Sequence, residues 1–205
     1  MLNKEEVVDI LKGGGALRKG HFKLSSGLHT AEYVQMALVL QYPLYAAKLC
    51  EGIANLFKEE TIQVVISPAI GGIVIGQKVA EIRGARAIFA EKEGQKLVLR
   101  RGFKIYPGEK VLVVEDVITT GGSVKKIIEI VEDNQGEVVG VGCIVDRSGE
   151  SVNFIVNKST LRPKSLLTLE IKNYLKEECP LCKSGLPLSR PGSRDLKSNG
   201  KKDCI

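Results

Sequence analysis

The chain contains no tryptophan and only two histidines, and aromatic residues of all kinds make up 5% of its 205 residues. Single-stranded nucleic-acid-binding modules commonly stack bases on aromatic side chains, and no such platform accompanies the positive charges of this sequence. We therefore expect no nucleic-acid partner, although the formal net charge is +6. A basic surface attracts anionic small molecules equally well.

Long apolar runs are also missing. No stretch reaches the roughly 18 consecutive apolar residues that a membrane-spanning helix requires. The first six residues, Met1 to Glu6, include acidic side chains where a secretory signal carries its apolar segment. The sequence therefore predicts a cytoplasmic protein with no membrane partner.

Cysteines are few, and their number is odd: Cys50, Cys143, Cys179, Cys182 and Cys204. A disulfide framework is therefore not expected. Cys179 and Cys182 form a lone Cys-x-x-Cys pair, whereas a structural zinc ion usually takes four ligands, and the only histidines, His21 and His29, lie far upstream. We expect a tight turn in a C-terminal extension rather than a zinc site within one chain; pooling of cysteine pairs from two chains is the open alternative.

The chain does show an alternation of strand and helix patterns. Strands are predicted at 62–67, 85–90, 110–115 and 138–146, with helices at about 73–83 and 124–131 between them. Upstream, a capping box predicts a helix from Asn3 that stops at Gly13, a polar loop at 21–30, and a helix from Pro43 to about Glu60. Such alternation favours an α/β fold with a central, mainly parallel sheet flanked by helices.

A basic stretch, Glu91–Pro107, interrupts the alternation. It carries cations around a short apolar run, and it reads as an inserted hairpin. Long insertions in compact domains are often lids or binding loops, but an ordinary exposed hairpin has the same composition. The cations that are lid candidates are Lys92, Lys96, Arg100 and Arg101.

The segment Val111–Ser123 carries the clearest chemical pattern. An apolar strand ends in Glu115 and Asp116, and a loop of threonines and glycines then opens a helix. A helix N-terminus with closely approachable glycines binds phosphate, and two adjacent acids suit sugar hydroxyls or a Mg²⁺ ion that holds them. The pattern therefore indicates a sugar-phosphate site.

This run resembles the phosphoribosyl-diphosphate signature of the type I phosphoribosyltransferases. The resemblance implies that Asp116 and Lys92 are the catalytic residues and that the acids bind ribose hydroxyls. It also implies a mobile basic lid and Mg²⁺ held mainly by substrate, with no metal bound by the protein alone. The residues it assigns to phosphoribosyl diphosphate are Lys92, Glu115, Asp116, Val117, Ile118, Thr119, Thr120, Gly121, Gly122 and Ser123.

Two further segments resemble the orotate phosphoribosyltransferases of that family: the run Gly20–Gly27, continued by Tyr33 and Gln35, and the pair Asp146-Arg147. The likeness implies that Ser26, Gly27, Thr119 and Arg147 contact orotate, and a guanidinium suits a carboxylate base. Ser25 and Gly72 stand where many members have lysine, and the insertion lacks their histidine. The segment around Cys179-Pro180-Leu181-Cys182 is similar to a subgroup found in some thermophiles.

The resemblance predicts a phosphoribosyltransferase domain over 1–175, with a small hood at about 1–42 and a C-terminal extension over 176–205 that holds the Cys-x-x-Cys pair and a basic tail. It further implies a homodimer. The predicted function is transfer of the phosphoribosyl group to orotate for UMP synthesis. The alternatives are transfer to a purine or uracil, and a non-catalytic sensor of phosphoribosyl diphosphate.

Overall fold

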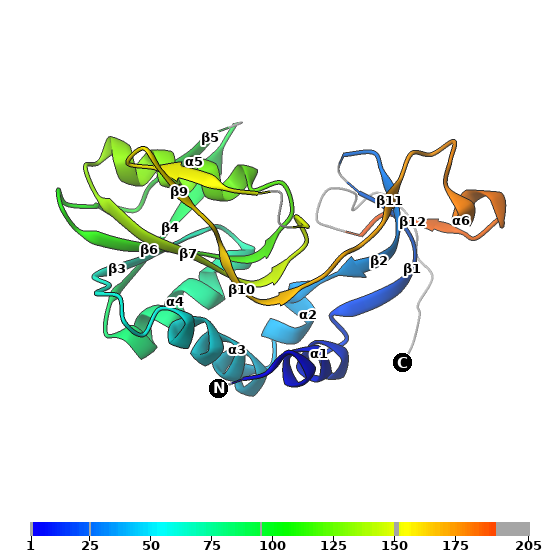
Figure 1. Ribbon diagram of the computed structural model, residues 1–205, viewed down its shortest axis with the longest axis horizontal. Coiled ribbons are helices and arrows are strands. Elements are labelled where there is room, and N and C mark those ends of the chain that lie inside the picture. Colours follow the sequence, from blue (N-terminus) through cyan, green and yellow to red (C-terminus); the bar gives the residue numbers. More distant parts are fainter. Residues whose placement is uncertain (1, 25, 95, 150–151, 192–205) are drawn as a thin grey trace. The chain divides into compact units, whose positions relative to one another are not determined.

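The computed structural model describes residues 2–24, 26–94, 96–149 and 152–191, and Figure 1 shows their secondary structure. The chain divides into two compact units. The first comprises residues 1–16 and 36–170, and the second comprises 17–35 and 171–205. The first unit contains a six-stranded sheet and a two-stranded sheet, and the second unit contains a four-stranded sheet.

The sheet of the first unit has six strands in the order β10-β7-β6-β3-β4-β5. Every neighbouring pair is parallel except β4 and β5, which form an antiparallel hairpin. The predicted mainly parallel sheet is confirmed. The strands are β3 (Val64–Pro68), β4 (Arg86–Glu93), β5 (Lys96–Leu99), β6 (Lys110–Ile118), β7 (Glu137–Asp146) and β10 (Lys164–Thr168).

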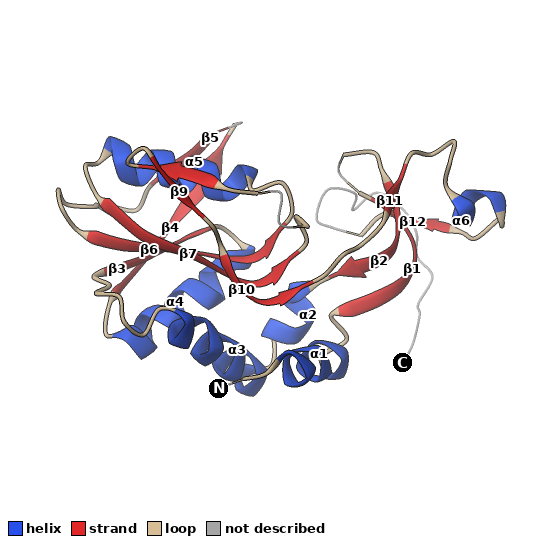
Figure 2. Ribbon diagram, viewed as in Figure 1, coloured by secondary structure: helices blue, strands red, loops and turns tan. Residues whose placement is uncertain are grey.

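Helices cover both faces of this sheet (Figure 2). Helices α3 (Pro43–Leu56) and α4 (Gly71–Arg83) pack on one face, and α5 (Gly122–Asp133) packs on the other. A strand buried on both faces must be apolar at consecutive positions, and Val111 to Val114 of β6 are 0% exposed. The remaining elements of this unit are α1 (Lys4–Gly13), α2 (Met36–Leu40), β8 (Phe154–Val156) and β9 (Ser159–Leu161).

The predicted capping box at the start of α1 is present, since the Asn3 side chain accepts from the backbone N–H of Glu6 and the Glu6 side chain accepts from that of Asn3. Helix α3, however, ends at Leu56, before the predicted end at Glu60. The N–H of Phe57 bonds to the carbonyl of Ala54, three residues back, which closes the last turn. The Phe57 ring is then buried, with 2% of its surface exposed.

The second unit contains a four-stranded sheet in the order β11-β2-β1-β12. Its elements are β1 (Leu17–Lys23), β2 (His29–Val34), β11 (Asn173–Tyr174), α6 (Pro180–Lys183) and β12 (Leu188–Ser189). The predicted polar loop at 21–30 was therefore wrong at both ends. His21, His29 and Thr30 are polar yet buried in this sheet, so their polarity did not mark a loop.

The predicted boundary after residue 175 stays a prediction. The chain passes between the two compact units after residues 16, 35 and 170. Within the described residues, no helix is both long and apolar enough to cross a membrane. The predicted basic tail falls largely on residues 192–205, which lie outside the described part of the chain, as do Ser25 and Cys204.

Candidate active site

The predicted sugar-phosphate loop lies at the carboxyl end of β6. The strand runs to Ile118, and Thr119 to Gly121 connect it to α5, which begins at Gly122. Gly121 is the N-cap of α5 and has φ +71°, a conformation that side-chain-bearing residues rarely adopt. The first N–H groups of α5 therefore face the loop with no helical partner, as a phosphate requires.

The surroundings of Gly121 also leave no room for any residue type other than glycine. A Cβ built there would lie 2.7 Å from Cγ1 of Val152 and 3.1 Å from the Phe154 ring. The segment around β8 thus packs directly on the turn of the loop, which only a glycine permits. Sequence reasoning missed this support, because β8 is a three-residue strand with no strong pattern.

An open hollow lies over this loop. Its lining is almost the set predicted to bind the sugar phosphate: Glu115, Val117, Ile118, Thr119, Thr120, Gly121, Gly122, Ser123 and Val124. Thr119, Thr120 and Ser123 are exposed, so their hydroxyls are accessible to a ligand. The structure therefore brings the predicted loop residues together around one space.

The two acids differ in environment. Glu115 is buried, with 8% of its surface exposed, whereas Asp116 is half-buried. Burial first, and then the charge of Asp116, raises the pKa of the Glu115 carboxyl well above its ordinary value. Burial and the neighbouring carboxylate thus both disfavour the charged form of Glu115.

A tight turn after β3 faces Asp116. A Cβ on Gly71 would lie 2.6 Å from Oδ2 of Asp116, so glycine keeps that oxygen accessible. The other oxygen, Oδ1, accepts the backbone N–H of Val117 at 2.7 Å. The turn contains a cis peptide bond between Ala69 and Ile70. Through Gly71, the turn Pro68–Gly72 lies against Asp116, the acid predicted to bind the ribose.

The residues predicted to contact the base in this unit are adjacent. Ile118 pairs with Asp146 in the β6–β7 register, and the backbone N–H of Arg147 donates to the carbonyl of Ile118 at 2.8 Å. Arg147 therefore starts beside Thr119 at the same edge of the sheet. The buried Asp146 accepts the N–H of Ser148 at 2.8 Å and so holds the turn that follows.

The other two predicted base contacts, Ser26 and Gly27, belong to the second unit. They lie in the turn between β1 and β2, and both are exposed. The turn is closed by backbone hydrogen bonds from Gly27 to Leu24 and from Leu24 to Leu28, and Gly27 has φ +89°.

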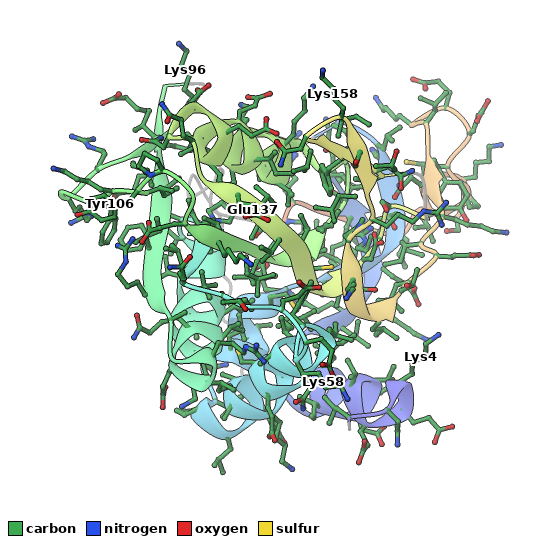
Figure 3. All side chains as sticks on the ribbon, turned by 60° about the vertical axis from the view of Figure 1, so that its left-hand side comes forward. Lys4, Lys58, Lys96, Tyr106, Glu137 and Lys158 are labelled. Carbon is green, nitrogen blue, oxygen red and sulfur yellow. The ribbon has the colours of Figure 1, made fainter. Side chains whose placement is uncertain are left out.

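The predicted basic insertion begins as the β4–β5 hairpin. Pro68 of β3 pairs with Ala90 of β4, so Lys92 lies beyond the carboxyl end of β3, at the edge of the sheet where the loop lies. The apolar run anchors the hairpin, because Leu97 is buried in the main core. Lys96 points away from the body of the unit (Figure 3).

The four lid candidates differ in whether they form an ion pair. Arg101 donates to both carboxylate oxygens of Glu91 at 2.9 Å, and Arg100 lies 3.8 Å from a carboxylate oxygen of Glu93. Within the described residues, Lys92 and Lys96 form no such pair, and both are exposed. The two lysines are therefore the cations of the hairpin that remain available to an anion.

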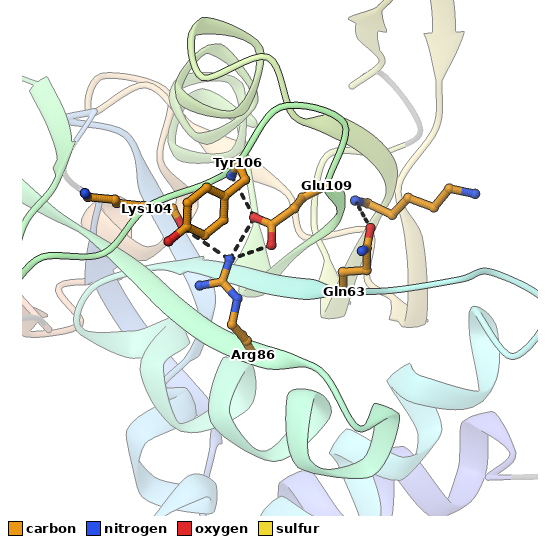
Figure 4. A network of polar contacts seen from close by, with 6 residues as sticks. Gln63, Arg86, Lys104, Tyr106 and Glu109 are labelled. Carbon is orange, nitrogen blue, oxygen red and sulfur yellow. Dashed lines mark hydrogen bonds and ion pairs between the residues drawn. The ribbon is translucent and has the colours of Figure 1, made fainter.

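A separate polar network holds the segment that returns from the hairpin to β6 (Figure 4). The Arg86 guanidinium donates to Glu109 at 2.7 and 2.8 Å and to the carbonyl of Lys104 at 3.2 Å. Glu109 also accepts the N–H of Tyr106 at 2.8 Å. Arg86 and Lys110 begin their strands, so this network lies at the edge of the sheet opposite the loop and has a structural role.

Comparison with known proteins agrees with this geometry. Residues 39–153 match the family model of the phosphoribosyl transferase domain. The chain is 50% identical to the orotate phosphoribosyltransferase of Desulforamulus reducens over 195 residues. The aligned region covers 95% of this chain and all of that protein. The orotate phosphoribosyltransferase of Caldicellulosiruptor saccharolyticus is 52% identical over 196 residues, with 96% and 100% coverage.

Solved structures show the same fold. The orotate phosphoribosyltransferase from Aeropyrum pernix matches with a TM-score of 0.66 at 27% identity, over 80% of this chain and 94% of that chain. The enzyme from Mycobacterium tuberculosis in complex with inorganic phosphate has a TM-score of 0.63 at 25% identity, over 81% and 95%. With relatives matched along nearly their whole length, the chain belongs to the orotate phosphoribosyltransferases, within the phosphoribosyltransferase family.

Proposed function

We propose that the protein transfers the 5-phosphoribosyl group from phosphoribosyl diphosphate to orotate, with release of diphosphate and orotidine 5′-phosphate, a step in UMP synthesis. The observation that carries the proposal is the loop Val117–Ser123, which links a buried strand to a helix N-terminus and lines one hollow with Glu115. The name that the near-full-length relatives share supports the choice of base.

The loop would bind the 5′-phosphate. The N–H groups at the start of α5 and the hydroxyls of Thr119, Thr120 and Ser123 are donors, and the helix dipole favours an anion there. The positive φ of Gly121 would turn the backbone so that the first N–H groups of α5 face the phosphate. This end of the substrate would thus be held by backbone geometry rather than by a lysine.

The acids would bind the ribose hydroxyls. Asp116 keeps Oδ2 accessible beside Gly71, and Glu115 lines the hollow. A Mg²⁺ ion fits this donor set, because it prefers one or two carboxylates completed by substrate oxygens. When bound, the ion would offset negative charge on the diphosphate leaving group. Asp116 and Glu115 would orient the ribose so that C1 faces the base.

Arg147 would recognise the base. Orotate carries a carboxylate, and a guanidinium offers it two parallel hydrogen bonds. Arg147 starts beside Thr119 at the end of the β6–β7 pair, so one edge of the sheet supplies contacts for both the base and the phosphate. Ser26 and Gly27 remain proposed contacts from the turn of the second unit.

Lys92 and Lys96 would act on the leaving group. No nucleophilic side chain is needed, since the base nitrogen attacks C1 while the diphosphate departs; positioning and charge stabilisation supply the rate. Lys92 lies past the carboxyl end of β3 and is available to an anion. Closure of the hairpin over the substrates would exclude water from the activated sugar. By family resemblance, we also propose a homodimer.

The test is a spectrophotometric assay with phosphoribosyl diphosphate, Mg²⁺ and orotate, run in parallel with adenine, hypoxanthine, guanine, xanthine and uracil. We expect Mg²⁺-dependent consumption of orotate only. Arg147→Ala should lower kcat/KM for orotate by about 100-fold or more, as expected when one partner of a charged, bidentate pair is removed.

The matched control is Arg162→Ala, which removes an exposed arginine of the same unit and should leave the rate within about twofold. Turnover with a purine or uracil alone would support the proposed sugar-phosphate site but refute orotate as the base. Binding of phosphoribosyl diphosphate without turnover of any base would show a sensor rather than an enzyme.

A further inference from the structure

Four side chains of the second unit that are far apart in the sequence lie close together in the structure. They are His21 of β1, His29 of β2, Cys179 at the N-cap of α6 and Cys182 within α6, and each has one ligand atom within 4.8 Å of the others. The expectation that the histidines lie too far upstream to join the cysteine pair was therefore wrong. In the second sheet β1 pairs with β12 and β2 pairs with β11, so the C-terminal segment lies beside the two strands that carry the histidines.

The distances suit a tetrahedral ion. In a zinc site with Zn–S near 2.3 Å and Zn–N near 2.05 Å, sulfur and nitrogen ligands lie about 3.5 Å apart. Here Nε2 of His21 lies 3.6 Å from both cysteine sulfurs, and Nδ1 of His29 lies 3.3 Å from Sγ of Cys182. The two nitrogens are 2.9 Å apart, somewhat closer than the roughly 3.3 Å of a metal-bound pair.

The hydrogen bonding around His21 prepares it as a ligand. Its Nδ1 lies 2.8 Å from the backbone carbonyl of Leu186, which can only accept. The proton therefore sits on Nδ1, and Nε2 is left with a lone pair aimed at the sulfurs. Metal-bound histidines nearly always make such a second hydrogen bond, which fixes the tautomer and the ring orientation.

Three of the four ligand residues are buried in a unit that has few other buried residues. His21, His29 and Cys179 have 3%, 1% and 0% of their surface exposed. The other buried residues among those described in this unit are Phe22, Thr30 and Val34, so the unit has very little apolar core of its own. Small sheets without a sufficient core commonly depend on a metal or disulfides.

We propose that His21 Nε2, His29 Nδ1, Cys179 Sγ and Cys182 Sγ bind one structural zinc ion that stabilises the second unit. Two thiolates and two imidazoles in a tetrahedral arrangement select zinc over the harder Mg²⁺. All four positions come from the protein, so no site remains for water or substrate and the role is structural. The site is distinct from the proposed transfer site and does not depend on it.

The first experiment measures zinc in the purified full-length protein by mass spectrometry of the metal. We expect about one zinc per chain, and its loss in Cys182→Ser. Cys50→Ala is the matched control: it removes a buried thiol from α3 of the first unit and should leave the zinc content unchanged. Equal zinc content in the wild type and Cys182→Ser would overturn the proposal.

The second experiment needs no variant to fold. Wild-type protein stripped by a chelator is titrated with Co²⁺ under reducing conditions. Strong visible bands of tetrahedral cobalt with thiolate charge transfer, saturating at about one ion per chain, are expected. Only weak octahedral absorption, or a Cys179–Cys182 disulfide in the freshly isolated protein, would refute the site. Neither readout involves orotate, so failure here leaves the proposed enzyme activity untouched.

Discussion

The two larger sheets of this protein bury different kinds of side chain. The six-stranded sheet of the first unit is covered on both faces by helices and packs aliphatic residues such as Val113 and Val141 at 0% exposure. The four-stranded sheet of the second unit buries His21, His29 and Thr30 instead. A large apolar core leaves strand ends free to carry a ligand site, whereas a small polar sheet must obtain its stability from specific bonds.

The comparison predicts that the two units respond differently to loss of metal, and this is the largest effect we expect. After chelation, backbone amides of β1 and β2 should lose protection from hydrogen exchange by about 1000-fold or more, because zinc binding is then no longer coupled to folding. Amides of β6 and β7 should keep their protection. Hydrogen exchange followed by mass spectrometry measures both units in one sample, and equal loss in both would contradict the division.

A second test probes the rigid loop of the first unit. Gly121→Ala should destabilise the protein by about 2–4 kcal/mol, because a positive φ and a crowded Cβ act together. Gly84→Ala is the matched control: that glycine also has positive φ, but no atom lies within 4 Å of the added Cβ. It should cost only about 1 kcal/mol. Urea unfolding measures both; equal costs would show that contact with Val152 and Phe154 is unimportant.

A third test concerns the lysines of the hairpin. Lys92→Ala should lower kcat/KM for phosphoribosyl diphosphate by roughly 10- to 100-fold, since a cation on the leaving group is lost. Arg101→Ala should change the rate less, because its guanidinium is already paired with Glu91. Lys48→Ala, on the helix α3, controls for loss of positive charge. A larger loss in Arg101→Ala than in Lys92→Ala would reverse the assignment.

The smallest effect concerns the buried acid. Burial raises the pKa of Glu115 in the folded state, so the folded protein holds the proton more tightly than the unfolded chain. The stability of the ligand-free protein should therefore fall as pH rises from the ordinary glutamate value toward the folded pKa. Glu115→Gln removes this dependence and should raise the melting temperature by a few degrees at neutral pH.

The gain from Glu115→Gln should shrink toward acidic pH, where the wild-type carboxyl is protonated in both states. The exposed Glu129→Gln on α5 is the control and should show no such trend. The same substitution at Glu115 should weaken transfer activity, so stability and function would move in opposite directions. A constant difference across pH would refute the assigned cause.

The sequence predicted the first unit well because its signals are local. The apolar residues Val111 to Val114 predict a buried strand, and the threonines and glycines after Asp116 predict a phosphate loop. Both signals lie within about a dozen residues. The second unit depends on pairing between residues 158 positions apart, such as His21 and Cys179. No local pattern reports such a pairing, and buried histidines in a strand look like loop residues when only polarity is considered.

The order of the second sheet has a consequence for biosynthesis. Strands β1 and β2 leave the ribosome early, but their outer neighbours, β11 and β12, are among the last described elements to be made. An isolated hairpin of two strands is only marginally stable in water. The strands of the first unit lie in the chain between β2 and β11. The first unit can therefore fold while β1 and β2 still lack their outer neighbours. The newborn protein completes its second sheet only when residues near Ser189 emerge.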